Sequence, residues 1–167
     1  QDNTAITATF TQDEYTLDVS TVGGGMVSKE PQQDTYNYGD VVTLTATADT
    51  GWTFESWSGD VEGTENPLAF TVEADTVITA TFSQDEYTLD VSTVGEGTVT
   101  REPEQDVYHY GDVVTLTATG EPGWTFVAWS GDVDSTANPL VLVVEDDTAI
   151  VATFKAKVYL PLVLANH

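Results

Sequence analysis

The sequence predicts an all-β protein built from two small tandem modules, each a sandwich-like set of antiparallel strands. Three observations lead to this prediction. The segment 15–82 returns 72 residues later as 87–154, with 47 identities in 68 positions and no gap. Short runs alternate apolar and polar residues, which is the pattern of half-buried strands. No window has the sustained 3.6-residue spacing of an amphipathic helix.

The strands of the first module can be placed in order. Residues 15–19 alternate, the glycines at 23–25 supply a turn, and 26–28 can return as a short partner strand. Threonine fills the polar positions, and because it is β-branched it suits a pleated surface that faces water. Each module therefore has five or six expected strands around an aromatic core, the later ones at 42–46, 52–57, 68–72 and 78–82.

Two segments remain outside the repeats. Residues 3–10 match 75–82 and 147–154, so we expect an orphan N-terminal strand within 1–12. The modules are expected at 13–83 and 84–155. Residues 156–167 form an apolar C-terminal tail in which Tyr159 takes the place of Tyr87 before the repeat sequence ends.

The composition excludes several classes of partner. There are 28 acidic residues against four basic ones, a net charge of -24, so nucleic acid and anionic membranes would meet no basic patch. No stretch is long enough to span a bilayer. The absence of cysteine excludes disulfides and thiolate metal sites. The chain begins at Gln1, and we expect a processed protein located outside the cell or at its surface.

The residue types of an enzyme do not recur between the two copies. His109 has Asn37 as its counterpart, and His167 has none, so a Ser-His-Asp arrangement is not expected. The recurring acids, such as Asp60 with Asp132, stand at strand ends where turns need them. We therefore expect no catalytic residue, and we expect all four tryptophans to serve as core and not as a sugar-stacking face: Trp52, Trp57, Trp124 and Trp129.

An acidic loop at 132–138 has some of the oxygen ligands that calcium prefers. Its counterpart at 60–66 has different ligand lengths, and neither loop has EF-hand spacing. We expect no structural metal site and no cofactor, while weak binding of divalent cations remains open.

One motif carries a resemblance to a known family. The run 51–60, with the alternating strand before it and Ile78-Thr79-Ala80-Thr81-Phe82 after it, resembles the divergent internalin-type B-repeat, and both modules are covered. The resemblance implies small β-rich modules in tandem on bacterial surface and secreted proteins, with a spacer, adhesive or structural role. Relatives of this family are compared with β-grasp folds, so a small α+β variant stays open.

The two ends of the chain predict assembly. Residues 158–164 are apolar on both strand faces, so they would pair with other strands and aggregate if they stayed in water. We expect them to add as a strand to a neighbouring copy near its residues 3–10, with the two adjacent lysines offsetting repulsion; folding back onto the second module is the alternative. The expected subunit interface is Ile6, Ala8, Phe10, Lys155, Lys157, Val158, Tyr159, Leu160, Leu162, Val163 and Leu164.

These features together predict a non-enzymatic extracellular structural protein, a filament or surface-stalk subunit that assembles head to tail with copies of itself. Two alternatives remain. The modules are an adhesin that binds carbohydrate or calcium, or they are a spacer fragment of a larger secreted enzyme.

Overall fold

The structure, a computed structural model, describes residues 5–158. The chain divides into two compact units at Gln84/Asp85, and each unit holds eight strands in the same order. The described residues contain no helix, so the all-β class is confirmed and the α+β variant does not apply. Within residues 5–158 no helix that would suit a membrane span is present.

Unit 1 begins with a short strand and ends with its longest one. Its strands are β1 (Glu14–Tyr15), β2 (Leu17–Val22), β3 (Gly25–Glu30), β4 (Tyr36–Asn37), β5 (Val41–Ala48), β6 (Trp52–Gly59), β7 (Leu68–Thr71) and β8 (Thr76–Gln84).

Unit 2 repeats this series of strands. Its strands are β9 (Glu86–Tyr87), β10 (Leu89–Val94), β11 (Gly97–Glu102), β12 (Tyr108–His109), β13 (Val113–Gly120), β14 (Trp124–Gly131), β15 (Leu140–Val143) and β16 (Thr148–Ala156).

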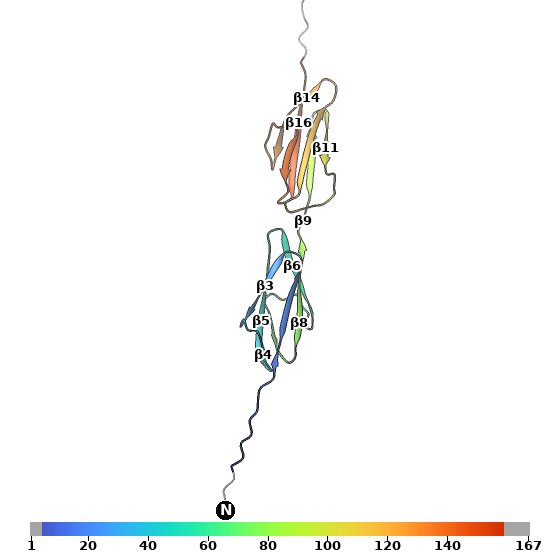
Figure 1. The fold of residues 1–167 in the computed structure, drawn as a ribbon. Helices are drawn as coiled ribbons and strands as arrows, with labels where there is room; N and C mark the ends of the chain where they lie inside the picture. Colours follow the sequence, from blue (N-terminus) through green and yellow to red (C-terminus); the bar gives the residue numbers. More distant parts are fainter. Residues whose placement is uncertain (1–4, 159–167) are drawn as a thin grey trace, which may run out of the picture. The chain divides into compact units, whose positions relative to one another are not determined.

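Each unit is a sandwich of two three-stranded sheets (Figure 1). In unit 1 one sheet has the order β2-β8-β6, the other has the order β3-β5-β7, and β1 pairs with β4. Unit 2 has the orders β10-β16-β14 and β11-β13-β15, with β9 beside β12. One core cluster in each unit contains residues of both sheets, which shows that the sheets pack face to face.

The core follows directly from the alternating sequence. In β5, Val42, Leu44 and Ala46 are buried while the threonines between them stay at the surface. The central strand β8 buries Ile78 and Phe82 against them from the opposite sheet. Burying each large apolar side chain contributes about 1.5–3 kcal/mol, so the two facing strands supply much of the stability of a unit.

The pairing differs from the sequence prediction at two places. The strand β3 does not return beside β2; it pairs with β5 in the other sheet, because the glycine turn carries the chain across the sandwich. Gly25 permits this crossing, since a Cβ there would lie 2.5 Å from the Phe82 ring. The second difference is that β2 and β8 run parallel, as do β10 and β16, whereas every other sheet pair is antiparallel.

Candidate assembly interface

The N-terminal segment has the sequence of a central core strand. Ile6, Ala8 and Phe10 occupy the repeat positions of Ile78, Ala80 and Phe82, which are 0%, 0% and 3% exposed in β8. At the N-terminus the same residue types lie in water: Ile6 is 92% exposed and Phe10 is 91% exposed.

The predicted orphan strand has no strand partner within the described chain, and its pairing with another copy stays a prediction. Residues 5–13 form no strand in the structure. Within the units the strand with this sequence is central, with a parallel neighbour on one side and an antiparallel neighbour on the other. Units 1 and 2 already use their own central strands, β8 and β16, so the described chain offers no place for a third.

The C-terminal half of the predicted interface is described only as far as Val158. Lys155 is exposed near the end of β16, opposite Thr125 of β14. The backbone N–H of Lys157 donates to the carbonyl of Gly123 at 2.7 Å, and the Val158 side chain is 83% exposed. The remaining predicted residues lie outside the described residues: Tyr159, Leu160, Leu162, Val163 and Leu164.

A basic side chain covers part of one sheet edge in each unit. The Nη1 of Arg101 donates to the carbonyl of Leu89 at 2.8 Å, and the Nζ of Lys29 donates to the carbonyl of Leu17 at 3.2 Å. The carbonyl of Thr88 accepts from Thr148 of β16, so the carbonyl of the following residue points away from that strand. The two cations thus engage edge carbonyls that would otherwise be open to strand pairing.

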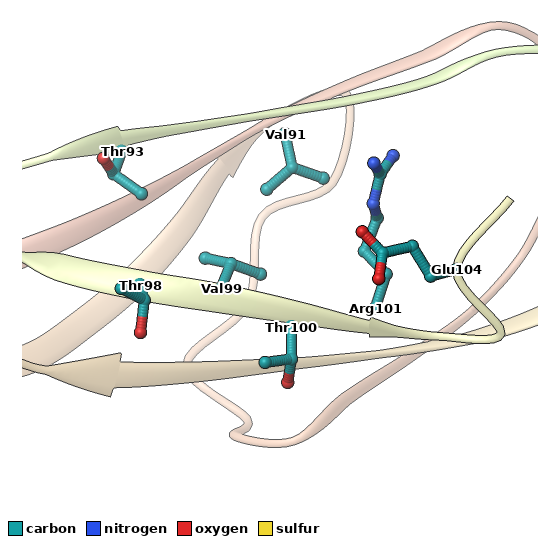
Figure 2. Close-up of a pocket in the computed structure, with 7 residues that line it drawn as sticks. All are labelled: Val91, Thr93, Thr98, Val99, Thr100, Arg101 and Glu104. Atoms are coloured by element: carbon teal, nitrogen blue, oxygen red, sulfur yellow. The ribbon is translucent and has the colours of Figure 1, made fainter. Parts of the chain in front are cut away.

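A cleft of about 410 Å³ lies between β10 and β11, the facing edge strands of the two sheets of unit 2. Figure 2 shows Val91 and Val99 directed toward one another from the two strands, with Arg101 and Glu104 at one end. Threonines complete the lining. The cleft offers apolar contacts and hydrogen bonds, but its lining contains no pairing of a nucleophile with a histidine base.

Several of the aspartates that recur between the units accept hydrogen bonds from backbone amides. The Asp60 carboxylate accepts from the Val77 N–H at 2.8 Å, and its counterpart Asp132 accepts from the Ala149 N–H at 2.7 Å. These bonds tie the end of one strand to the start of another, as the turn interpretation of the sequence expects.

Asp75 also accepts hydrogen bonds at the start of a strand, and these bonds lower the pKa of its carboxyl group. Its Oδ1 accepts from the Thr16 N–H at 2.8 Å and from the Thr16 hydroxyl at 3.1 Å. The backbone hydrogen bond, and after it the hydroxyl bond, hold the pKa of Asp75 below its ordinary value of 3.8. The pKa of Asp147 is lowered in the same way by Thr88.

In the loop that resembles a calcium site, the side-chain oxygen of Asn138 is used within the fold. The Asn138 side chain accepts from the Ala118 N–H at 2.9 Å and donates to the Ala118 carbonyl at 2.8 Å, so it pairs with β13 as a strand would. Asn66 makes the same two bonds to Ala46. Among residues 5–158 no group of three or more His, Asp or Glu side chains is placed to hold a metal ion.

His109 belongs to a turn of unit 2. The His109 N–H donates to Asp112 Oδ2 at 2.9 Å, and the corresponding N–H of Asn37 donates to Asp40 at 2.8 Å. Because asparagine fills the same place equally well, the turn does not depend on the imidazole.

The tryptophans divide into two pairs. Trp57 and Trp129 are 2% and 1% exposed, and the Trp57 Nε1 donates to the Glu65 carbonyl at 2.9 Å. Trp52 and Trp124 are half-buried and pack against their cores from the margin. The prediction that all four are core holds fully for the first pair and in part for the second.

Two complete β-sandwiches with the same topology, in which the recurring acids hold the backbone, define a tandem repeat protein. Residues 15–86 and 87–158 each match the family model of the divergent InlB B-repeat domain, so the chain belongs to this family and the resemblance is confirmed. The family is associated with bacterial cell-surface proteins. Comparison with curated proteins and with solved structures found no match.

Proposed function

We propose that this chain is a non-enzymatic structural protein outside the cell, a stalk or filament subunit whose modules are linked head to tail. The observation that carries the proposal is that each unit is a complete sandwich with its own core, and a single residue, Asp85, separates β8 from β9. Membership of a family associated with bacterial surface proteins supports an extracellular place.

The uses of the polar side chains support a non-enzymatic role. Asp60, Asp75 and their counterparts bind backbone amides, and the loop asparagines pair with strands. Every buried side-chain nitrogen and oxygen among the described residues has a hydrogen-bond partner. Polar groups held in this way stabilise turns and are not poised for proton or group transfer.

The parallel pairs within the modules support a specific mode of assembly. In unit 2, β10 lies parallel to β16, with Val91 opposite Ile150. The tail continues from Tyr159, which has the repeat position of Tyr87. Residues 4–10 match residues 148–154 of β16 except at Thr7, where β16 has Val151. We infer that the tail of one copy pairs in parallel with residues 4–10 of the next, which in this register sets Val163 opposite Ile6.

Such a contact joins two different surfaces, so its repetition gives an open filament. The exposed Lys155 and Lys157 lie beside the tail in a chain of net charge -24 and reduce the repulsion between copies. Exposed ion pairs contribute about 0–1 kcal/mol each, so the apolar strand supplies most of the affinity and the lysines adjust it.

Sedimentation velocity over a range of protein concentrations tests this assembly. We expect the full chain to form oligomers that deletion of 158–167, or Ile6→Asp, converts to folded monomers. Val141→Asp also replaces an apolar residue by aspartate, at a position on β15 that is 62% exposed, and it should leave the oligomers intact.

Lys155→Glu with Lys157→Glu should weaken the oligomers most at low salt. Oligomers that survive the deletion, or a full chain that is monomeric at high concentration, would show that strand addition is wrong.

A further inference from the structure

The first and last long strands of each module are neighbours that run in the same direction. β2 pairs with β8 over six residue pairs, from Leu17 with Thr76 to Val22 with Thr81. β10 and β16 repeat this ladder. The start of β2 therefore lies at one end of the ladder and the end of β8 at the other, and in Figure 1 the chain enters unit 1 beside β4 and leaves it at the far end.

This placement determines how tension along the chain acts on the module. A pull on the start of β2 and the end of β8 slides the two strands past each other, so the hydrogen bonds of the ladder are loaded together. A pull that separates two strands from a shared end loads the bonds one after another. Simultaneous loading gives the higher barrier, because many bonds must fail in one step.

The sheet order identifies the bond set that must fail. β2 is an edge strand in the order β2-β8-β6, whereas β8 is held on both sides. Release of β2 from β8 breaks one ladder, and withdrawal of β8 breaks two. Tension therefore acts first on the β2–β8 ladder.

A side-chain clasp lies at the end of the ladder where β2 and β8 begin. Thr16 stands immediately before β2 and Asp75 immediately before β8. Asp75 Oδ1 accepts from the Thr16 N–H and from its hydroxyl, and the Thr16 carbonyl accepts from the Thr76 N–H at 2.9 Å. A pull on β2 toward its start slides Thr16 along the strand axis past Asp75, so the bonds of the clasp are loaded in shear together with the ladder.

The clasp recurs in unit 2, where Asp147 accepts from the Thr88 N–H at 2.8 Å and from its hydroxyl at 3.0 Å. Unit 1 has one further link along the ladder, a hydrogen bond of 2.9 Å between the hydroxyls of Ser20 and Thr79. Val151 replaces Thr79 in unit 2 and makes no such bond. The backbone ladder and the clasp are thus the shared elements.

We propose that each module is a load-bearing unit in which the β2–β8 and β10–β16 ladders resist tension along the chain. The Thr16–Asp75 and Thr88–Asp147 clasps are the side-chain contacts that carry this load with the ladders. The biological use of this resistance rests on the proposed stalk role. The resistance itself is a property of the fold of one module, so it can be measured on single molecules that have not assembled.

Single-molecule stretching of the full chain in two directions tests the inference. The native sequence has no cysteine, so introduced pairs are unique attachment points. Asp13→Cys with Gln84→Cys pulls the ladder in shear, and Asp13→Cys with Glu73→Cys pulls both strands from the same end. All three positions are exposed. The short β1–β4 pair begins directly after Asp13, so it lies in the loaded path in both geometries and does not account for a difference between them.

We expect the unfolding force in shear to be several-fold higher than in the second geometry at the same loading rate. Equal forces would overturn the load-bearing assignment. That result would not contradict the stalk and assembly proposal, because sedimentation of the chain without introduced cysteines tests that proposal separately.

A second pair of variants tests the clasp. Asp75→Ala should lower the shear force by a larger factor than the force in the same-end geometry. Asp60→Ala removes a carboxylate-to-amide bond between β6 and β8 and should leave the ratio of the two forces unchanged. Asp75→Asn replaces Asp75→Ala if the alanine variant does not fold. Equal proportional losses in both directions for Asp75 would show that the clasp only stabilises the fold and is not specific to tension.

Discussion

At the scale of single residues, the aromatic core could be predicted but its detailed form could not. Strict alternation from Trp52 would put Phe54 and Ser56 on the core face and Trp57 on the outer face. The structure has a register shift between Phe54 and Ser56, and this bulge brings Trp57 into the core, where its ring lies 5.0 Å from that of Phe54. A bulge inserts one unpaired residue relative to the neighbouring strand, so the sequence of β6 alone does not reveal it.

The two tryptophans of β6 should respond differently to truncation. Trp57→Ala removes a side chain that is 2% exposed and breaks its bond to Glu65, so we expect a loss of about 3–5 kcal/mol in the free energy of unfolding. Trp52→Ala should cost clearly less because this side chain is half-buried. Urea unfolding followed by circular dichroism measures both losses. Equal losses would contradict the division of the tryptophans into core and margin.

At the scale of elements, alternation located most of the strands but not their partners. The pattern of β2 states that one face is buried, and this is equally true beside β3 or beside β8. Partner choice depends on contacts far apart in the sequence, such as Thr16 with Asp75. The two-residue strands β1 and β4 were missed because they are too short to show a period. The basic side chains that cover the edges of β2 and β10 also gave no local signal, since Lys29 and Arg101 reach carbonyls twelve residues away.

The clasps between terminal strands predict a pH dependence of stability. Hydrogen bonds from Thr16 and Thr88 lower the pKa values of Asp75 and Asp147 in the folded state. A carboxyl group with a lowered folded pKa adds stability that is complete above its unfolded pKa, and this stability is lost as the pH falls through the folded value. The contribution should therefore be present at neutral pH and disappear as the pH falls from the ordinary value of 3.8 to below the lowered values.

Asp75→Asn combined with Asp147→Asn should reduce the fall in stability between neutral and strongly acidic pH. Chemical unfolding of the wild type and the variant at both pH values gives this difference. Asp18→Asn removes an exposed carboxylate from β2 without touching the clasp and serves as the control. If the control flattens the pH profile as much as the double variant, general charge repulsion and not the clasp is responsible.

At the scale of the whole molecule, the internal repeat was the most informative signal. It predicted two modules, and the structure has two units with the same strand order. It also placed the sequence of a core strand at residues 3–10, but it did not show that residues 5–10 have no strand partner within the chain. The strands that would pair with this sequence inside units 1 and 2 are already paired with β8 and β16, which only the sheet order reveals. The candidate interface thus stays a prediction, for which the sequence supplies a set of residues and not a geometry.

The central claim is that this chain consists of two independent modules that resist tension. Stretching one full-length molecule from its two ends tests it most directly. We predict two separate unfolding events, each releasing one repeat of chain with an extended length of about 250 Å before the folded length is subtracted. The event from unit 2 should require a force similar to that from unit 1, since both ladders span six residue pairs. Gradual extension at low force without separate events, or one event that releases both repeats together, would contradict the claim.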